Sequence, residues 1–361
     1  MNDQVRKKPP LWVFRHGVQT REAYHLVQPE HSVKVNQNEN PYEIPAPLKQ
    51  KILDRFRDVQ WSRYPPFVPD AFHELLARHY RVEPDQVIAG NGSNELLYAT
   101  FITVLDPGDS IVLPVPTFTL YGILAGVQGA HIETVQMKSP FELDAQAVIT
   151  KSREANAKLT VICTPNNPTA VAYPRQDIER ILREVPGLVL LDLAYVEFAD
   201  EDLTDLIAQH DNLIVLRTFS KALSLAGLRV GCAIGNPKLL QMVNKGKLPY
   251  ALDAFSMTAL EILLSSSEIF DGPIQTIRED RERLFQGMRS IEGIHPIPGQ
   301  ANFILARFDC GSMAAYQAFL DAGILVRNVS HYSGLEGHLR VSIGSSEETD
   351  AILEVCRNLS S

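Results

Sequence analysis

The sequence predicts an α/β protein with a large domain, built on a mainly parallel sheet flanked by helices, and a smaller α/β C-terminal domain. Beyond residue 85, short apolar runs alternate with longer segments of helical pattern, the order of elements that characterises this fold class. The apolar runs are nearly continuous, as expected for strands that are buried on both faces. The chain has 361 residues, more than one hydrophobic core usually organises.

Seven apolar runs are the candidate strands of the large sheet, and helical segments lie between them. The predicted strands cover residues 87–89, 110–113, 131–135, 159–163, 188–192, 213–217 and 230–234. The clearest predicted helices cover residues 94–105, 176–184 and 274–291. We expect an N-terminal arm over residues 1–45, a large domain over 46–250 and a small domain over 251–361.

Composition excludes several classes of protein. The formal net charge is −9 and no basic stripe is present, so a nucleic-acid-binding role is not expected. No apolar run approaches the roughly 20 residues that span a bilayer. The four cysteines are dispersed without metal-ligand spacing, which favours reduced, mostly buried thiols in a cytoplasmic protein and no metal site.

Polar and aromatic residues follow several of the predicted strands. Ligands of parallel α/β sheets bind at the carboxyl ends of the strands, so residues placed there are candidates for a functional site. The segments that end strands in this way are 90–95, 117–119, 164–169, 192–195 and 218–221. Each alone is compatible with an ordinary turn, and only their joint occurrence indicates a shared site.

Lys221 is the most informative of these residues. It follows the apolar run 213–216 within Thr218-Phe219-Ser220-Lys221, where burial is costly for an ammonium and lowers its pKa. A lysine of this kind, with hydroxyls and Arg229 nearby, suits covalent attachment of an aldehyde cofactor whose phosphate needs an anchor. A solvated lysine at the start of a helix is the alternative.

Two further strand ends fit the same cofactor. The glycine-rich segment 90–95 opens a helix, so its backbone N–H groups form an anion site. Asp192 closes an apolar run, and a buried carboxylate needs a partner such as a protonated ring nitrogen.

Taken together, these stretches resemble the fold-type-I pyridoxal-phosphate aminotransferases, and among them the histidinol-phosphate aminotransferase family. The similarity covers about residues 36–344, most of the chain. The stretches that carry it are NQNENP (36–41), SRYP (62–65), GNGSNE (90–95), PTFTLY (116–121), TPNNPT (164–169), LLDLAYVEF (190–198), RTFSKALSLAGLRVG (217–231), ANFILARF (301–308) and GHLRVSIGS (337–345).

The resemblance implies a role for each matching residue. Lys221 would hold pyridoxal 5′-phosphate and move a proton, Asp192 would pair with the ring nitrogen, and Tyr195 would bind the ring's phenolic oxygen together with Asn167. Phe118 would stack on the ring. The phosphate would be held by Ser93, Asn94, Thr218, Ser220 and Arg229, and by Tyr64 of a neighbouring subunit, which requires a homodimer.

For the substrate, the resemblance points to Arg340 and Arg327, with Asn40 nearby and Tyr24 closing the site. Guanidinium groups suit both carboxylates and phosphates, although surface ion pairs would explain either arginine on spacing alone. Two residues depart from the family pattern. Leu193 replaces an acidic residue and would remove a charge close to the ring, and Ala170 replaces a glycine, so its turn either avoids a positive φ or tolerates strain.

The resemblance implies a histidinol-phosphate transaminase. Its two substrate pairs would be L-histidinol phosphate with imidazole acetol phosphate, and L-glutamate with 2-oxoglutarate. An aromatic or other α-amino-acid aminotransferase and a threonine-phosphate decarboxylase share the scaffold and remain alternatives. A nucleotide-binding α/β protein without pyridoxal phosphate is a further alternative, but the first predicted strand is not followed by G-x-G-x-x-G.

Overall fold

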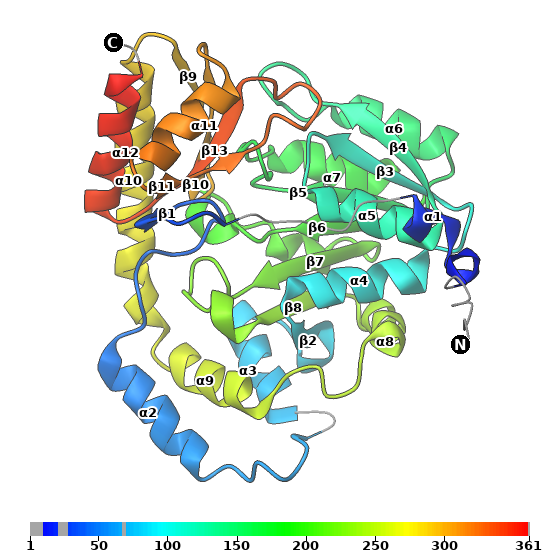
Figure 1. Cartoon of the computed structure of the whole chain (residues 1–361). Coiled ribbons are helices and arrows are strands. Elements are labelled where there is room, and N and C mark those ends of the chain that lie inside the picture. Colours follow the sequence, from blue (N-terminus) through cyan, green and yellow to red (C-terminus); the bar gives the residue numbers. More distant parts are fainter. Residues whose placement is uncertain (1–9, 21–27, 67–69, 360–361) are drawn as a thin grey trace, which may run out of the picture.

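The computed structural model describes residues 10–20, 28–66 and 70–359, and every structural statement below concerns these residues. The chain forms a seven-stranded sheet, a four-stranded sheet and a two-stranded sheet. In Figure 1 the large sheet lies on the right and the two smaller sheets lie at the upper left, near the C-terminus.

The seven-stranded sheet has the order β2-β8-β7-β6-β5-β3-β4. Only β8 runs antiparallel to its neighbours, so the sheet is mainly parallel, as expected from the sequence. In chain order its strands are β2 (Val87–Asn91), β3 (Ser110–Val115), β4 (His131–Gln136), β5 (Leu159–Cys163), β6 (Leu188–Asp192), β7 (Leu213–Thr218) and β8 (Val230–Gly235).

Helices cover both faces of this sheet. Alternate strand residues point to opposite faces: Ile214 and Leu216 of β7 join one core cluster, whereas Leu213 and Val215 join the other. The first cluster includes residues of α4 (Ser93–Val104), α5 (Thr119–Gln128) and α8 (Pro237–Gly246). The second includes residues of α3 (Asp70–Tyr80), α6 (Ala145–Glu154) and α7 (Arg175–Glu184).

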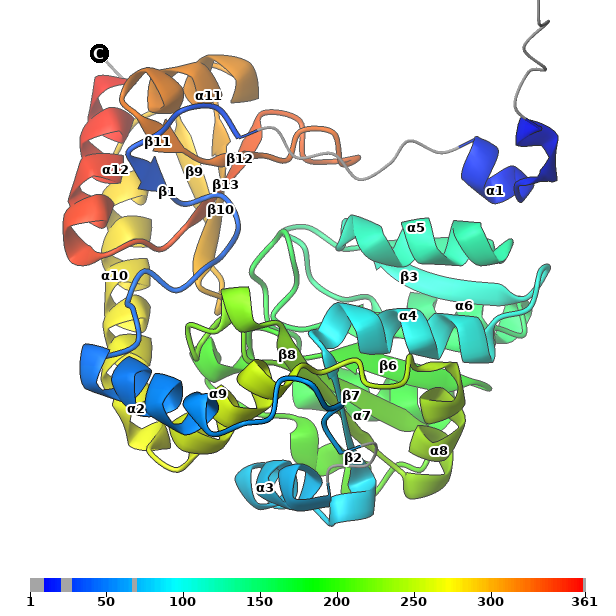
Figure 2. The same ribbon diagram turned by 60° about the horizontal axis from the view of Figure 1, so that its bottom comes forward.

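The C-terminal part builds the smaller sheets. The four-stranded sheet has the order β12-β13-β10-β9, with β9 (Ile294–Ile297), β10 (Phe303–Phe308), β12 (Arg327–Asn328) and β13 (His338–Ser342). The N-terminal arm joins this region, because β1 (Val33–Lys34) pairs in parallel with β11 (Ile324–Leu325). Figure 2 shows β1 beside these strands and α1 (His16–Gln19) over α5. The helices of this part are α10 (Asp271–Arg289), α11 (Ser312–Asp321) and α12 (Ser346–Asn358).

Two helices form a layer of their own. The helix α2 (Ala46–Arg57) packs on α9 (Ala254–Leu264), and α9 also packs on α3. Short 3₁₀ turns complete the chain: η1 (Leu11–Val13), η2 (Pro84–Gln86), η3 (Val196–Phe198), η4 (Thr204–Ala208), η5 (Ala226–Leu228) and η6 (Ser267–Phe270). Within the described ranges, no helix has the length and apolar character needed to cross a membrane.

All seven predicted strands are present, and β5 and β6 have the predicted bounds. The other five strands extend one or two residues further, because the ladders continue through residues that carry no strand signal, such as Gly90 and Asn91 of β2. The three predicted helices correspond to α4, α7 and α10 within a few residues. Three cysteines are buried, Cys310 is exposed, and all four are free thiols.

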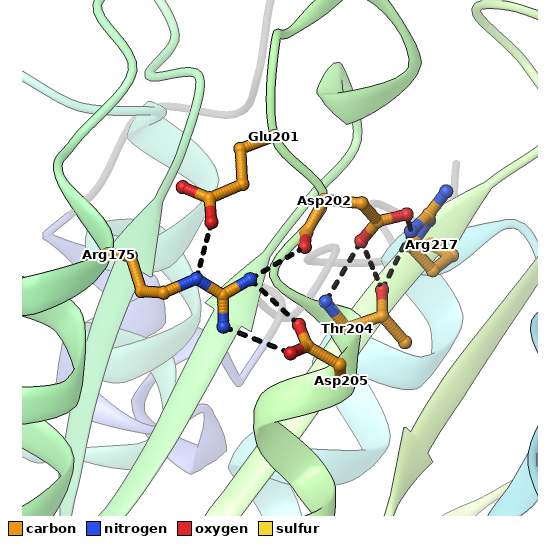
Figure 3. A network of polar contacts seen from close by, with 6 residues as sticks. All are labelled: Arg175, Glu201, Asp202, Thr204, Asp205 and Arg217. Carbon is orange, nitrogen blue, oxygen red and sulfur yellow. Dashed lines mark hydrogen bonds and ion pairs between the residues drawn. The ribbon is translucent and has the colours of Figure 1, made fainter.

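A network of charges joins the segment that follows β6 to the end of β7 (Figure 3). Arg217 is 4% exposed and donates to Asp202 Oδ2 at 2.6 Å and to Thr204 Oγ1 at 2.7 Å. It also pairs with Glu197 at 2.9 Å. On the outer side of this segment, Arg175 contacts Glu201 and both carboxylate oxygens of Asp205.

Candidate active site

A cavity of about 540 Å³ lies at the carboxyl ends of β5, β6 and β7. Residues from both ends of the chain line it. Asn36 and Arg340, for example, are 304 positions apart in the sequence. The residues predicted from the sequence that line it are Ser93, Asn94, Phe118, Asn167, Asp192, Tyr195, Thr218, Ser220, Lys221, Arg229, Arg327 and Arg340.

One end of the cavity is built to hold an anion. The helix α4 begins at Ser93, directly after Gly92, so its free N–H groups face this end. Gly92 has φ +74°, and a Cβ on it would lie 2.5 Å from an Nη atom of Arg229. Arg229 in turn donates to Ser220 Oγ at 3.3 Å. The positive φ favours glycine at this position, and the missing Cβ leaves room for the Arg229 guanidinium beside the helix N-terminus.

Asp192 lies on the floor of the cavity at the end of β6. It is 7% exposed, and it accepts hydrogen bonds from the Tyr121 hydroxyl at 2.7 Å and from the backbone N–H of Ala194 at 3.1 Å. Burial raises the pKa of this carboxyl, against the lowering effect of these two donors. No described residue forms an ion pair with Asp192, so the carboxylate can accept a cationic N–H from a ligand.

Tyr195 and Asn167 form the side wall. Asn167 Nδ2 donates to Tyr195 Oη at 3.3 Å. Burial raises the pKa of Tyr195 far above its usual value, so the hydroxyl keeps its proton. Phe118 also lines the cavity, and its ring lies edge-to-face with that of Tyr121 at a centroid distance of 5.5 Å.

Lys221 projects into the cavity from the bend after β7. Its Nζ donates to the backbone carbonyl of Gln37 at 2.8 Å. Burial, Arg340 and Arg229 lower the pKa of Lys221 to about 8, whereas Glu39 acts in the opposite direction. A substantial fraction of the amine is therefore neutral near physiological pH, the state that attacks an aldehyde. The sequence predicted this direction from burial alone.

Two arginines that line the cavity lie side by side on neighbouring strands. Arg327 and Arg340 are paired residues of the antiparallel strands β12 and β13. Like charges in this position repel each other, so an anion between them would be stabilised. Arg340 also donates to Asn167 Oδ1 at 2.6 Å and to the carbonyl of Asn36 at 2.7 Å.

Among the described residues, two that were predicted from the sequence do not line the cavity, Tyr64 and Asn40. Tyr64 is 80% exposed, and its ring stacks on that of Tyr250 at 4.6 Å. Asn40 donates to the carbonyl of Ala222 at 2.9 Å and lines a neighbouring cavity of about 360 Å³ instead. Tyr24 lies outside the described residues.

The two departures from the family pattern have separate explanations. Leu193 points away from the active-site cavity, since it is fully buried and lines another cavity with Val196 and Leu203. The expectation that its presence removes a charge close to the ring stays a prediction, and the structure adds only that Leu193 does not line the active-site cavity. Ala170 has φ +64°, so its turn tolerates strain rather than avoiding a positive φ.

Several residues of the site were not identified from the sequence. Tyr121 holds Asp192, Asn38 contacts Tyr195 at 3.0 Å, and Tyr332 lines the cavity and interacts with Thr119. Asn38 lies in the motif NQNENP, which was the available signal. Tyr332 belongs to an irregular loop between β12 and β13, where no local pattern predicts its position.

Comparison with known proteins agrees with this geometry. The sequence profile of the family "Aminotransferase class I and II" matches residues 30–356. The chain belongs to this family. Its relatives include the histidinol-phosphate aminotransferase of Chlorobaculum tepidum, which is 40% identical over 91% of this chain and 95% of that protein. The histidinol-phosphate aminotransferase of Thermococcus gammatolerans is 36% identical over 95% and 96% of the two chains.

Solved structures of the family share the fold. The histidinol-phosphate aminotransferase of Sinorhizobium meliloti, solved in complex with pyridoxal-5′-phosphate, superposes with a TM-score of 0.86 at 22% identity, covering 96% of this chain and 97% of that one. L-threonine-O-3-phosphate decarboxylase from Porphyromonas gingivalis superposes with a TM-score of 0.78 at 20% identity, covering 91% and 99%. These likenesses establish the fold-type-I architecture.

As an aminotransferase of this family, the protein uses pyridoxal 5′-phosphate, and the cavity fits this group. The anion site at the start of α4 suits the phosphate. Asp192, which forms no ion pair with a described residue, suits the protonated ring nitrogen. Lys221 supplies a partly neutral amine in the cavity that Arg229 and Ser220 also line.

Proposed function

We propose that the protein transfers the amino group of L-histidinol phosphate to 2-oxoglutarate, giving imidazole acetol phosphate and L-glutamate in histidine biosynthesis. The curated relatives at 36–40% identity that are named for this reaction support the proposal. The structural observation that carries it is the paired arrangement of Arg327 and Arg340 at one cavity. Two guanidinium groups can donate hydrogen bonds either to the phosphate of one substrate or to the carboxylate of the other.

The cofactor supplies an aldehyde that accepts the amino group and a ring that withdraws electrons from the substrate Cα. Asp192 keeps the ring nitrogen protonated, because a buried carboxylate favours a cationic neighbour. Tyr195 and Asn167 hold the phenolic oxygen. Lys221 would hold the cofactor covalently, and its amine would serve as the group that moves the proton of the substrate Cα. The phosphate is held by Ser93, Asn94, Thr218, Ser220 and Arg229.

The substrate residues act through position and charge. Arg340 is fixed by Asn167 and by the carbonyl of Asn36, which orients its planar group before a substrate arrives. Arg327 approaches from the neighbouring strand, with Tyr332 beside it along the cavity wall. Asn40 supports the site indirectly, since its side chain holds the backbone next to Lys221.

We further propose a cytoplasmic homodimer. Four free thiols agree with a reducing compartment. Trp61 and Tyr64 are 76% and 80% exposed, and solvent-facing aromatic side chains of this size favour an interface. Tyr64 would reach the cofactor phosphate of the partner subunit. The domain ranges 1–45, 46–250 and 251–361 also stay a proposal, supported by the order of the seven-stranded and four-stranded sheets along the chain.

The proposed reaction is tested with steady-state kinetics of the purified enzyme loaded with pyridoxal phosphate. L-Histidinol phosphate with 2-oxoglutarate should give parallel double-reciprocal lines, as a two-step exchange requires, and the highest kcat/KM among the donors tested. A higher value for L-phenylalanine would move the substrate to an aromatic amino acid. Release of CO₂ from threonine phosphate without a keto acid would identify the decarboxylase. Lys221→Ala should abolish transamination, with exposed Lys245→Ala as the matched control.

A further inference from the structure

The hydroxyl of Tyr195 accepts two hydrogen bonds from amide groups. Asn38 Nδ2 donates to Tyr195 Oη at 3.0 Å, and Asn167 Nδ2 donates to the same atom at 3.3 Å. Asn38 and Tyr195 are 1% and 5% exposed, so water does not compete for these contacts. A tyrosine hydroxyl has one proton to donate and also accepts hydrogen bonds, and here its oxygen already accepts two.

The orientation of Asn167 is fixed by Arg340. A guanidinium group can only donate hydrogen bonds, and Arg340 Nη1 lies 2.6 Å from Asn167 Oδ1. That atom is therefore the carbonyl oxygen of the amide. The amide nitrogen must then be the atom that faces Tyr195.

The orientation of Asn38 is fixed by Ser342 on β13. Ser342 Oγ accepts the backbone N–H of Asn38 at 2.9 Å and donates its own proton to Asn38 Oδ1 at 3.0 Å. The amide nitrogen of Asn38 is thus left to face Tyr195. Asn302 Nδ2 also donates to the carbonyl of Asn38 at 3.0 Å, and Asn38 adopts a left-handed φ of 56°. These contacts hold the residue in one conformation.

Because its oxygen already accepts two hydrogen bonds, the proton of Tyr195 has one direction left, which is the cavity that this side chain lines. We propose that Asn38 is a positioning residue that, together with Asn167, directs the Tyr195 proton to the phenolic oxygen of the cofactor. The inference rests on the cofactor placement proposed above and extends it to a residue from the N-terminal arm.

The arrangement has a measurable effect on the cofactor linked to Lys221. A donor to the phenolic oxygen stabilises its negative charge and so lowers the pKa of the linked nitrogen. The other charges that face this nitrogen are Asp192, Arg340, Arg229, Glu39 and Lys34. All of them are retained when only residue 38 is changed, so the contribution of the Tyr195 proton can be isolated.

The test is a spectrophotometric pH titration of the visible absorption band of the cofactor-loaded enzyme. Asn38→Asp keeps the shape of the side chain, tolerates a left-handed φ and turns the donor into an acceptor that takes the Tyr195 proton. The pKa of the band should rise by about one unit or more. An unchanged pKa would overturn the inference.

A double variant separates the redirected proton from the added charge. In a Tyr195→Phe background, Asn38→Asp should shift the pKa of the band only slightly, because no hydroxyl proton remains to be redirected. A full shift in that background would show that the carboxylate acts by its charge alone, and would overturn the inference.

A second route covers the case in which Asn38→Asp does not fold. Ser342→Ala removes the hydroxyl that fixes the amide of Asn38, so the amide can rotate and accept the Tyr195 proton. The pKa of the band should again rise, by a smaller amount, and no rise would contradict the inference. If the wild-type protein forms no visible band with pyridoxal phosphate, the cofactor placement itself fails, which is a different result.

Discussion

Arg340 on β13 donates to Asn167 Oδ1, in the turn that follows β5, across 2.6 Å. The contact joins a residue proposed to bind the substrate to a residue proposed to bind the cofactor. It also joins the small sheet to the large one, over 173 positions of sequence. The site is therefore complete only when the two sheets are held in this relative position.

Replacing Arg340 by lysine should impair both half-reactions. A lysine ammonium is a point charge that cannot contact Asn167 and an oxyanion in one plane. We expect kcat/KM to fall by about ten- to a hundredfold for L-glutamate and for L-histidinol phosphate alike. The measurement is the rate of each half-reaction by stopped-flow absorbance. A loss for one substrate only would contradict a shared anion site.

Replacing Asp192 by alanine should slow the chemical step. Without this carboxylate the ring nitrogen loses its protonated state, and the ring withdraws fewer electrons from the substrate. We expect kcat/KM to fall at least about a hundredfold, equal to about 2.7 kcal/mol. The control is Tyr121→Phe, which keeps the carboxylate and removes one of its donors. Near-normal turnover of Asp192→Ala would assign the carboxylate a structural role only.

The reactivity of Lys221 should depend on pH around a value of about 8. Because only the neutral amine attacks the aldehyde, the rate at which apoprotein takes up pyridoxal phosphate should rise with pH and level off above that value. Glu39→Gln removes a negative charge near Lys221 and should lower the midpoint. Lys34→Gln removes the cation that contacts Glu39 at 2.6 Å and should raise it. Shifts of the same sign in both variants would contradict this electrostatic account.

The proposed role of Tyr64 can be tested by mixing subunits. In a homodimer of Lys221→Ala, or in one of Tyr64→Ala, both active sites carry the substitution, so both sites should be impaired. In a heterodimer of the two variants, one site carries both defects and the other carries neither. We expect co-expressed, purified heterodimers to have about half of the wild-type activity, measured per dimer. Activity no higher than that of the Tyr64→Ala homodimer would place Tyr64 within its own subunit's site.

The two arginines of Figure 3 should differ in their contribution to stability. Arg217→Leu leaves the buried carboxylate of Glu197 without a cation and should lower the free energy of unfolding by about 3–5 kcal/mol. Arg175→Leu removes contacts to the exposed side chains of Glu201 and Asp205 and should cost about 1 kcal/mol or less. Urea denaturation of the apoproteins provides the comparison. Equal losses would contradict the difference in burial.

The sequence was sufficient for the large sheet because its strands are continuous apolar runs, and strands of this kind are buried whatever their neighbours. It was also sufficient to place Lys221 and Asp192 at the carboxyl edge of the sheet, since Asp192 ends one such run and Lys221 lies a few residues after another. Residues that act from irregular segments could not be predicted in this way. Asn38 contacts Tyr195 over 157 positions, and no local pattern records that contact.

Leu193 illustrates a second limit. The family pattern identifies position 193 as a departure. It does not show which way the side chain of Leu193 points, because that depends on how β6 ends. The pairing of Arg327 with Arg340 is a third case, because it depends on the register of two short strands. Both arginines were predicted from the sequence, but their pairing on neighbouring strands could not be predicted.

The most direct test of the account is the visible spectrum of the protein loaded with pyridoxal phosphate, recorded before and after addition of L-histidinol phosphate. We predict a yellow band that requires Lys221 and that is bleached by L-histidinol phosphate and by L-glutamate, but hardly by L-phenylalanine or L-aspartate. A band bleached best by L-phenylalanine would contradict the substrate assignment. The absence of any band would contradict the role of Lys221.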